Sequence, residues 1–179
     1  MAQKRKIPVL SIVGRSNTGK TTLIEKMIRE LTARGYRVAT IKHNLHGFEI
    51  DHPGKDSWRH REAGARLTVL ASPKKVALVR DVERDYTIDE IRDRYVEDAD
   101  IIIVEGYKEN DFPKIEVFRS SLGNELLGKK EGNLLAVASD RPLGVDVPCL
   151  DINDARGIVD MVEMRFLRMK AKKSVKTER

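Results

Sequence analysis

Cysteine and long apolar runs are almost absent from this sequence. Its 179 residues include a single cysteine, Cys149, so the chain cannot form an internal disulfide. The longest apolar runs, residues 101–104 and 134–138, have the length of buried strands and fall far short of the roughly 18 residues that span a bilayer. We therefore expect a protein of a reducing compartment, the cytoplasm, with no membrane partner.

Aromatic residues are scarce as well, at 5% of the chain, and the net charge of +6 is unevenly distributed. Residues 165–179 contain seven Lys and Arg and one Glu, so this segment carries the whole excess of positive charge. The neutral body of the chain argues against a nucleic-acid-binding face, which needs clustered basic residues. We expect no nucleic-acid partner, and we expect residues 171–179 to form a basic C-terminal tail.

A phosphate-binding sequence lies near the N-terminus. Residues 14–21 match G-x-x-x-x-G-K-[ST] at every fixed position, between an apolar run and an amphipathic helical pattern, which argues against a chance Gly-rich turn. Such a loop turns backbone N–H groups toward an anion, and the following helix adds its positive dipole end. Lys20 can reach the β- and γ-phosphates, and Thr21 can ligate Mg²⁺. The predicted nucleotide contacts are Gly14, Arg15, Ser16, Asn17, Thr18, Gly19, Lys20, Thr21 and Thr22.

The order of the remaining patterns predicts the fold. Short apolar runs alternate with helical patterns, which is typical of an α/β protein with a mostly parallel sheet. With the phosphate loop, they predict a three-layer P-loop NTPase fold in a single domain over residues 1–170, extended by a β-hairpin that turns at residues 72–74. We expect strands at residues 8–13, 37–42, 67–71, 75–79, 101–104, 115–118 and 134–138, and helices at 20–34, 57–64, 154–170 and after a capping box from Thr87 to Glu90.

Carboxylates at three positions could complete the site. Glu105 follows the apolar run 101–104, where a P-loop protein needs an acidic group for Mg²⁺ or its water; the alternative is a strand-end glutamate at the surface. Asp51 and Asp56 lie in a long polar loop in the position of a switch region and could orient water; the alternative is a solvated, charge-rich loop. The predicted catalytic residues are Lys20, Asp51, Asp56 and Glu105, and the predicted metal ligands are Thr21 and Glu105.

Asp140 is a candidate for recognition of the base. It follows the apolar run 134–138, and an aspartate after a late strand can accept two hydrogen bonds from the guanine edge. A strand-end Asp is also a common turn residue, and the Asn and Lys of the full guanine motif are absent. The assignment of Asp140 to guanine therefore rests on its position along the chain.

Several further stretches form a combination with the P-loop, and the middle block among them is far more specific than the P-loop. They are Ile41-Lys42-His43-x-x-His46, Ile50-Asp51-x-Pro53-Gly54-Lys55-Asp56-Ser57-x-Arg59, Ala63-Gly64-Ala65, Val104-Glu105-Gly106-Tyr107-Lys108 and Lys114-Ile115-Glu116-Val117-Phe118-Arg119. With the P-loop, these stretches make residues 7–160 similar to the MobB family, the molybdopterin-guanine dinucleotide biosynthesis adapter proteins.

The resemblance implies a cytoplasmic homodimer that binds GTP and Mg²⁺ and has weak GTPase activity. It would act as an adapter that assists the guanylyltransferase MobA in attaching GMP to molybdopterin. The phosphate and Mg²⁺ roles then fall on residues 14–22 and Glu105, the loop roles on Asp51 and Asp56, and the guanine role on Asp140.

The resemblance also draws attention to three basic residues. Lys108, Lys114 and Arg119 could hold an anionic pterin phosphate, so molybdopterin itself is a candidate ligand, or they could contact a partner. The alternative for all three is ordinary surface charge.

Two other functions stay open. An ATP-dependent small-molecule kinase would use the same loop to deliver a γ-phosphoryl group, but residues 120–132 hold only Lys129 and Lys130 and lack the arginine cluster of a kinase lid. A strong preference for ATP over GTP would favour the kinase. A non-enzymatic nucleic-acid binder that uses the basic tail is the weaker alternative, because the rest of the chain is neutral.

Overall fold

The computed structural model describes residues 6–107, 110–123, 125–127 and 133–167. The chain forms two compact units: residues 1–43 with 92–179, here called the sheet unit, and residues 44–91, here called the hairpin unit. The hairpin unit is an insertion, because the chain leaves the sheet unit after His43 and returns to it at Arg92. A single domain over residues 1–170 stays a prediction, and the expected tail lies outside the described residues.

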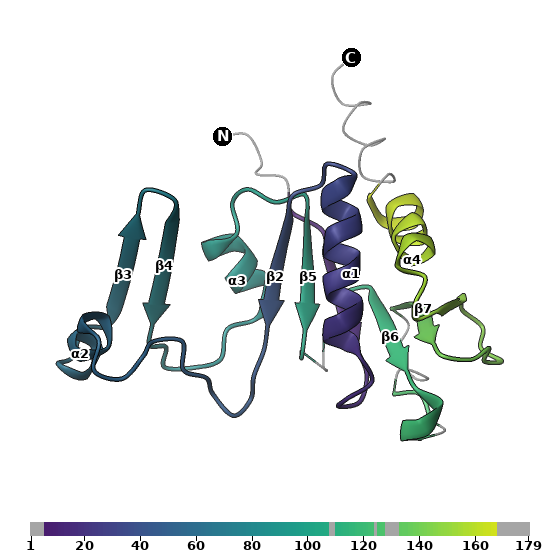
Figure 1. Cartoon of the computed structure of the whole chain (residues 1–179), viewed down its shortest axis with the longest axis horizontal. Helices are drawn as coiled ribbons and strands as arrows, with labels where there is room; N and C mark the ends of the chain where they lie inside the picture. Colours follow the sequence, from purple (N-terminus) through teal and green to yellow (C-terminus); the bar gives the residue numbers. More distant parts are fainter. Residues whose placement is uncertain (1–5, 108–109, 124, 128–132, 168–179) are drawn as a thin grey trace, which may run out of the picture. The chain divides into compact units, whose positions relative to one another are not determined.

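The sheet unit is built on six parallel strands. They are β1 (Val9–Val13), β2 (Val38–Lys42), β5 (Ile101–Glu105), β6 (Lys114–Phe118), β7 (Leu134–Ser139) and β8 (Cys149–Asp151). Their order in the sheet is β2-β5-β1-β6-β7-β8, and each neighbouring pair is parallel. The carboxyl ends therefore share one edge, at the bottom of Figure 1, where helix α1 (Lys20–Ala33) also begins.

The central strands carry apolar side chains that are buried on both faces of the sheet, as is usual in parallel sheets. Residues Ile101 to Val104 of β5 are at most 1% exposed, and their β-branched side chains favour the extended chain. One face packs in a common core with α1 and α4 (Ala155–Val162). Leu23, Met27 and Leu31 form the buried stripe of α1 because residues four apart share a helix face. This packing fixes the start of α1 at the carboxyl edge of the sheet, close to the end of β1.

The hairpin unit contains helix α2 (Asp56–Glu62) and the antiparallel strands β3 (Leu67–Ser72) and β4 (Lys75–Arg80). Opposite residues of an antiparallel pair point to the same side of the sheet. The register therefore gathers one mainly apolar face, here called the hairpin face, from Leu67, Val69, Ala71, Val76 and Leu78, with Arg80 opposite Leu67 at its end. Its large members are 39–72% exposed.

The predicted capping box at Thr87 is confirmed. It begins helix α3 (Ile88–Tyr95), where Thr87 Oγ1 accepts from the Glu90 N–H at 3.2 Å and Glu90 Oε2 accepts from the Thr87 N–H at 3.0 Å. Arg84 Nη1 donates to Glu90 Oε2 at 2.9 Å. The Arg84 guanidinium and the Thr87 N–H together lower the pKa of Glu90 to about 2. The start of α3 is therefore held by a charge as well as by the cap.

The predicted α/β class, with a mostly parallel sheet and a β-hairpin, is confirmed. Strand β8 was not among the expected strands, because three residues give too short a pattern to detect. The last helix was expected over residues 154–170; α4 ends at Val162 and continues as the π-helical turn η2 (Glu163–Leu167), and residues 168–170 are not described. In the described part of the chain, no helix combines the length and the apolar character needed to cross a membrane.

Candidate nucleotide-binding site

The P-loop leaves β1 and curls through three residues of positive φ. These are Gly14 at +148°, Asn17 at +63° and Gly19 at +96°. Asn tolerates the left-handed region better than most side chains, and glycine is unrestricted there. Gly14 is also required by close approach, because a Cβ at this position would lie 2.5 Å from the backbone oxygen of Val117. The loop is therefore shaped by the turn and by the neighbouring strand β6.

Hydrogen bonds inside the loop fix its carbonyl groups. Lys20 Nζ donates to the backbone oxygens of Gly14 at 3.1 Å and Arg15 at 2.8 Å, and Thr18 Oγ1 donates to Arg15 O at 2.9 Å. The C=O and the next N–H of a trans peptide point in opposite directions. Because these carbonyls turn toward Lys20 and Thr18, the N–H groups of Arg15 and Ser16 face the other way, where an anion can accept from them.

The start of α1 suits an anion. Gly19 is the N-cap residue and provides no side-chain cap, and the first turn contains no acidic residue. Its N–H groups and positive dipole end are therefore not satisfied by the protein's own carboxylates in this turn. Thr21 and Thr22 lie exposed in this turn, and Ser16 and Asn17 lie exposed on the loop. A bound phosphate could reach each of them from solvent.

Glu105 meets Thr21 at the carboxyl edge of the sheet. Thr21 Oγ1 donates to Glu105 Oε1 at 3.3 Å, and Lys42 Nζ lies 3.9 Å from Glu105 Oε2. Mg²⁺ prefers oxygen ligands and usually binds through one or two protein groups together with phosphates and water. A hydroxyl beside a carboxylate fits that pattern. Among the described residues, no group of three or more His, Cys, Asp or Glu is placed to hold a metal ion by itself.

The position of Glu105 depends on Gly106. A Cβ at Gly106 would lie 2.4 Å from the backbone oxygen of His43, which follows β2. The His43 N–H donates to Glu105 O at 2.8 Å, and the rings of His43 and Tyr107 stack with centroids 4.0 Å apart. Strands β2 and β5 therefore stay joined beyond their last ladder pair, which keeps the Glu105 side chain beside the P-loop.

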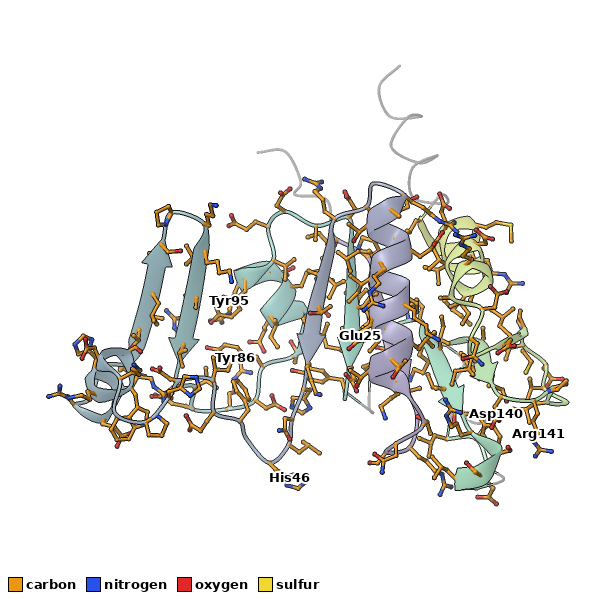
Figure 2. All side chains as sticks on the ribbon, in the orientation of Figure 1. Glu25, His46, Tyr86, Tyr95, Asp140 and Arg141 are labelled. Atoms are coloured by element: carbon orange, nitrogen blue, oxygen red, sulfur yellow. The ribbon has the colours of Figure 1, made fainter. Side chains whose placement is uncertain are left out.

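Asp140 lies directly after β7, at the same end of the sheet as the 3₁₀ turn η1 (Ser120–Leu122) (Figure 2). Its carboxylate accepts from the Ser120 N–H and from the Ser120 hydroxyl, both at 3.0 Å. The Ser120 N–H, with smaller contributions from the hydroxyl and the charge of Arg119, lowers the pKa of Asp140. Asp140 is thus an ionised acceptor that holds the chain after β6; its role toward guanine stays a prediction.

Asp51 and Asp56 belong to the hairpin unit, and their catalytic role stays a prediction. Asp51 Oδ1 accepts from the Ser57 hydroxyl at 2.9 Å and from the His52 N–H at 3.0 Å. Asp51 Oδ2 is buried, and no hydrogen-bond partner is found for it among the described residues. Asp56 is exposed and begins α2, where its charge favours the helix N-terminus. The two carboxylates therefore have different environments.

The three basic residues marked by the resemblance have different outcomes. Lys108 lies outside the described residues. Lys114 is 1% exposed and its Nζ donates to Asn110 O at 3.0 Å, so the alternative of ordinary surface charge is wrong for this residue, and its role toward a pterin phosphate or a partner stays a prediction. Every residue of β6 is buried. The sequence did not indicate this, because the alternation of polar and apolar residues in Lys114-Ile115-Glu116 is typical of a half-buried strand. Arg119 instead reaches the P-loop: its Nε donates to Thr18 O at 3.0 Å.

Comparison with known proteins gives the family. The family model described as Molybdopterin guanine dinucleotide synthesis protein B, or MobB, matches residues 9–140. The chain belongs to the MobB family. The matched region contains the P-loop, the hairpin unit, Glu105, Arg119 and Asp140, so the family assignment covers the whole candidate site of this MobB-family chain.

Individual relatives agree with this assignment. The chain is 42% identical to the molybdopterin-guanine dinucleotide biosynthesis adapter protein of Escherichia coli (strain K12), over 90% of this chain and 95% of that protein. It is 39% identical to the protein of the same name from Haemophilus influenzae, over 88% of both chains. The crystal structure of a molybdopterin-guanine biosynthesis protein B aligns with a TM-score of 0.73 and 32% identity, over 87% of this chain and 98% of that one. MobB of Bacillus subtilis aligns with a TM-score of 0.71 and 26% identity, over 88% and 97%.

Proposed function

We propose that this MobB-family chain is a GTP-binding adapter with weak GTPase activity that acts in molybdopterin guanine dinucleotide biosynthesis. The observation that carries the proposal is the P-loop, whose carbonyls are held by Lys20 and Thr18 and which leads into a helix start with no side-chain cap. Proteins named for the same biosynthesis at 42% and 39% identity support the biological role.

Different residues around the loop would bind the phosphates, hold Mg²⁺ and orient water. Residues 14–22 hold the phosphates through backbone N–H groups, and the Lys20 ammonium adds charge where the terminal phosphates lie. Thr21 and Glu105 would hold Mg²⁺, which neutralises phosphate charge when it is bound. Asp51 or Asp56 orients the attacking water. Slow hydrolysis would follow from an incomplete site that a partner completes, for example by supplying an arginine finger.

Asp140 recognises guanine in this proposal. An ionised carboxylate offers about four acceptor positions, and two of them are used by Ser120. The remaining positions can accept from the N–H groups of the guanine edge, whereas adenine would bring no matching pair of donors. The lowered pKa of Asp140 supports the role, because only the ionised group is a pure acceptor.

The proposed partners are a second copy of the chain and the guanylyltransferase MobA, in the cytoplasm. The homodimer is supported by the hairpin face, an apolar surface made of Leu67, Val69, Ala71, Val76 and Leu78 that a two-stranded sheet cannot bury by itself. MobA would receive the nucleotide-bound adapter, and molybdopterin is the further ligand that we propose for the assembled complex.

Calorimetric titration of GTP, GDP and ATP with Mg²⁺ tests the nucleotide-binding proposal. Wild-type protein should bind GTP more tightly than ATP. Lys20→Ala should weaken GTP binding by about 100-fold, since it removes charge-assisted hydrogen bonds worth roughly 3 kcal/mol. Lys26→Ala is the matched control, because Lys26 is on the same helix and its side chain makes a long, exposed hydrogen bond of 3.5 Å to Asn153. If Lys20→Ala binds GTP as wild type does, the P-loop is not the nucleotide site.

The guanine assignment needs a separate variant. Asp140→Asn should reduce the preference for GTP over ATP by about tenfold, because one acceptor of the guanine edge becomes a donor. Unchanged selectivity would assign guanine recognition to another residue while leaving the P-loop assignment intact. An ATP preference in the wild-type protein would instead favour a kinase.

A further inference from the structure

The residues that follow β6 and β7 form a contact between the end of the sheet and the P-loop. Phe118 and Ser139 are partners in the parallel register, so the next residues, Arg119 and Asp140, leave the sheet side by side. Arg119 turns to the P-loop, where its Nε donates to Thr18 O at 3.0 Å. Asp140 turns to the chain after Arg119 and accepts twice from Ser120. The two contacts are therefore consecutive along the chain.

The Arg119 contact fixes the orientation of one P-loop peptide. Because the Thr18 C=O points at the guanidinium, the Gly19 N–H of the same trans peptide points to the opposite side. The guanidinium lies against Gly19: Nη2 is 3.5 Å and Nε 3.7 Å from the position that a Cβ would occupy. Gly19 is the N-cap of α1, where backbone N–H groups bind phosphate. Arg119 thus acts on a predicted phosphate donor without taking its place.

Asp140 limits the movement of Arg119. Arg119 is the extended residue before η1, with φ −129° and ψ 125°, and its carbonyl accepts from the Leu122 N–H at 3.0 Å. Without another support, this turn would be free to swing, because β6 has already ended. The Asp140 carboxylate ties Ser120 to the end of β7 with two hydrogen bonds, and thereby holds the residue next to it.

We propose that Arg119 is a positioning residue for the P-loop: it holds the Gly19 N–H toward bound phosphates, and Asp140 holds Arg119 in place through Ser120. The contact couples the phosphate end of the site to the strand end proposed for guanine. The nucleotide-binding part of this inference rests on the proposed function, whereas the orientation of the Gly19 N–H can be measured without any ligand.

Two substitutions of Arg119 separate geometry from charge. Arg119→Gln removes the guanidinium and should weaken GTP, GDP and ATP equally, by about tenfold, as expected for a charge-assisted hydrogen bond. Arg119→Lys keeps the charge but has a methylene group where Arg carries Nε, so it should not restore affinity. Arg141→Gln is the matched control, because Arg141 is exposed and lies after β7 at the same edge of the sheet (Figure 2). Full restoration by Lys, or wild-type affinity of Arg119→Gln, would overturn the positioning role.

A nitrogen-15 NMR spectrum of the nucleotide-free protein gives an independent readout. Arg119→Gln and Arg119→Lys should shift or broaden the Gly19 amide resonance, whereas Arg141→Gln should leave it unchanged. An unperturbed Gly19 resonance in both Arg119 variants would overturn the inference even if nucleotide binding were weaker. If wild-type protein failed to bind any nucleotide but Gly19 responded as expected, the proposed function would fail and the positioning contact would stand.

Ser120→Ala tests the part assigned to Asp140. It removes the hydroxyl donor to the carboxylate but keeps the Ser120 N–H donor, so it frees one acceptor position of Asp140 and takes none away from guanine. We expect GTP and ATP affinity to fall together by about threefold, the loss of one neutral-donor hydrogen bond at a partly exposed site. Wild-type affinity for both nucleotides would remove Asp140 from the contact, and a loss confined to GTP would assign Ser120 to base recognition instead.

Discussion

The sheet unit and the hairpin unit contain similar apolar strands with opposite burial. Residues Ile101 to Val104 of β5 are at most 1% exposed, whereas Val69 of β3 is 52% and Val76 of β4 is 72% exposed. Both sets are β-branched and suit a pleated strand. The difference lies in the neighbouring strands: β5 has a strand on each side, whereas in the described part of the chain β3 and β4 pair only with each other. An isolated two-stranded hairpin is marginally stable, so the hairpin unit needs a cover that the sheet unit does not.

Glycines in the two units also differ. A Cβ would lie 2.5 Å from a backbone oxygen at Gly14 and 2.4 Å from one at Gly106, both in the sheet unit. In the hairpin unit, Gly47, Gly54 and Gly64 have positive φ, but a Cβ would meet nothing within 4 Å. Close backbone approach therefore shapes the nucleotide site, whereas turn geometry alone explains the glycines of the hairpin unit.

Gly14→Ala should have the largest effect. The added methyl group must displace β6 or the P-loop, so we expect a loss of about 3 kcal/mol in the free energy of unfolding, from overpacking together with positive-φ strain, and loss of nucleotide binding. Gly54→Ala is the matched control and should cost about 1 kcal/mol, because only the strain applies. Urea unfolding followed by circular dichroism measures both. Equal losses in the two variants would contradict the steric contrast between the units.

Val76→Lys should have the next largest effect, on assembly. A lysine at the turn end of the hairpin face places a charge in the proposed interface, so the dissociation constant of the dimer should rise at least about tenfold. Sedimentation equilibrium measures the change. Met164→Lys is the control, because Met164 is 61% exposed and lies in η2 of the sheet unit. A monomeric wild-type protein would remove the homodimer, and a Val76→Lys dimer of wild-type affinity would place the interface elsewhere.

Local patterns in the sequence predicted much of the fold. The P-loop, the strand that ends at Glu105, the hairpin and the capping box at Thr87 each depend on residues close together in the chain, and the structure contains all four elements. Helix α1 was predicted within one residue because its apolar spacing and Gly35 both mark it. The class of fold then followed from the order of the elements.

Contacts between distant segments could not be predicted in this way. Arg119 was noted as a basic residue, but its contact with Thr18 depends on the strand order β1-β6, which the sequence does not state. Lys114 looked like a surface charge, because a buried lysine has no local signal. The hydrogen bonds from Ser120 to Asp140 require the register of β6 and β7. For these residues, only the topology brings the partners together.

Glu90→Gln should have the smallest effect on stability. It tests a charge that lies in the hairpin unit. The pKa of Glu90 is lowered from 4.5 to about 2 by Arg84 and the Thr87 N–H, so the folded state favours the ionised form. A lowered pKa gives stability that is complete above pH 4.5 and is lost as the pH falls through 2. Denaturant unfolding can be followed by the fluorescence of Trp58, the single tryptophan. The denaturant concentration at the midpoint should fall in wild-type protein as the pH falls through this window. In Glu90→Gln the midpoint should depend less on pH.

The wild-type and Glu90→Gln proteins should converge below pH 2, where both side chains are neutral. The effect is modest because the Arg84–Glu90 pair is solvated, and added salt should reduce it further. Glu25→Gln is the matched control in the sheet unit, since Glu25 is an exposed residue of α1 (Figure 2) with a 3.9 Å ion pair to Arg29. Of these two glutamates, Glu90 alone combines a guanidinium partner with a helix cap, so Glu25→Gln should leave the pH dependence of stability nearly unchanged. If Glu25→Gln reduced this dependence as much as Glu90→Gln, the acid response would come from overall charge.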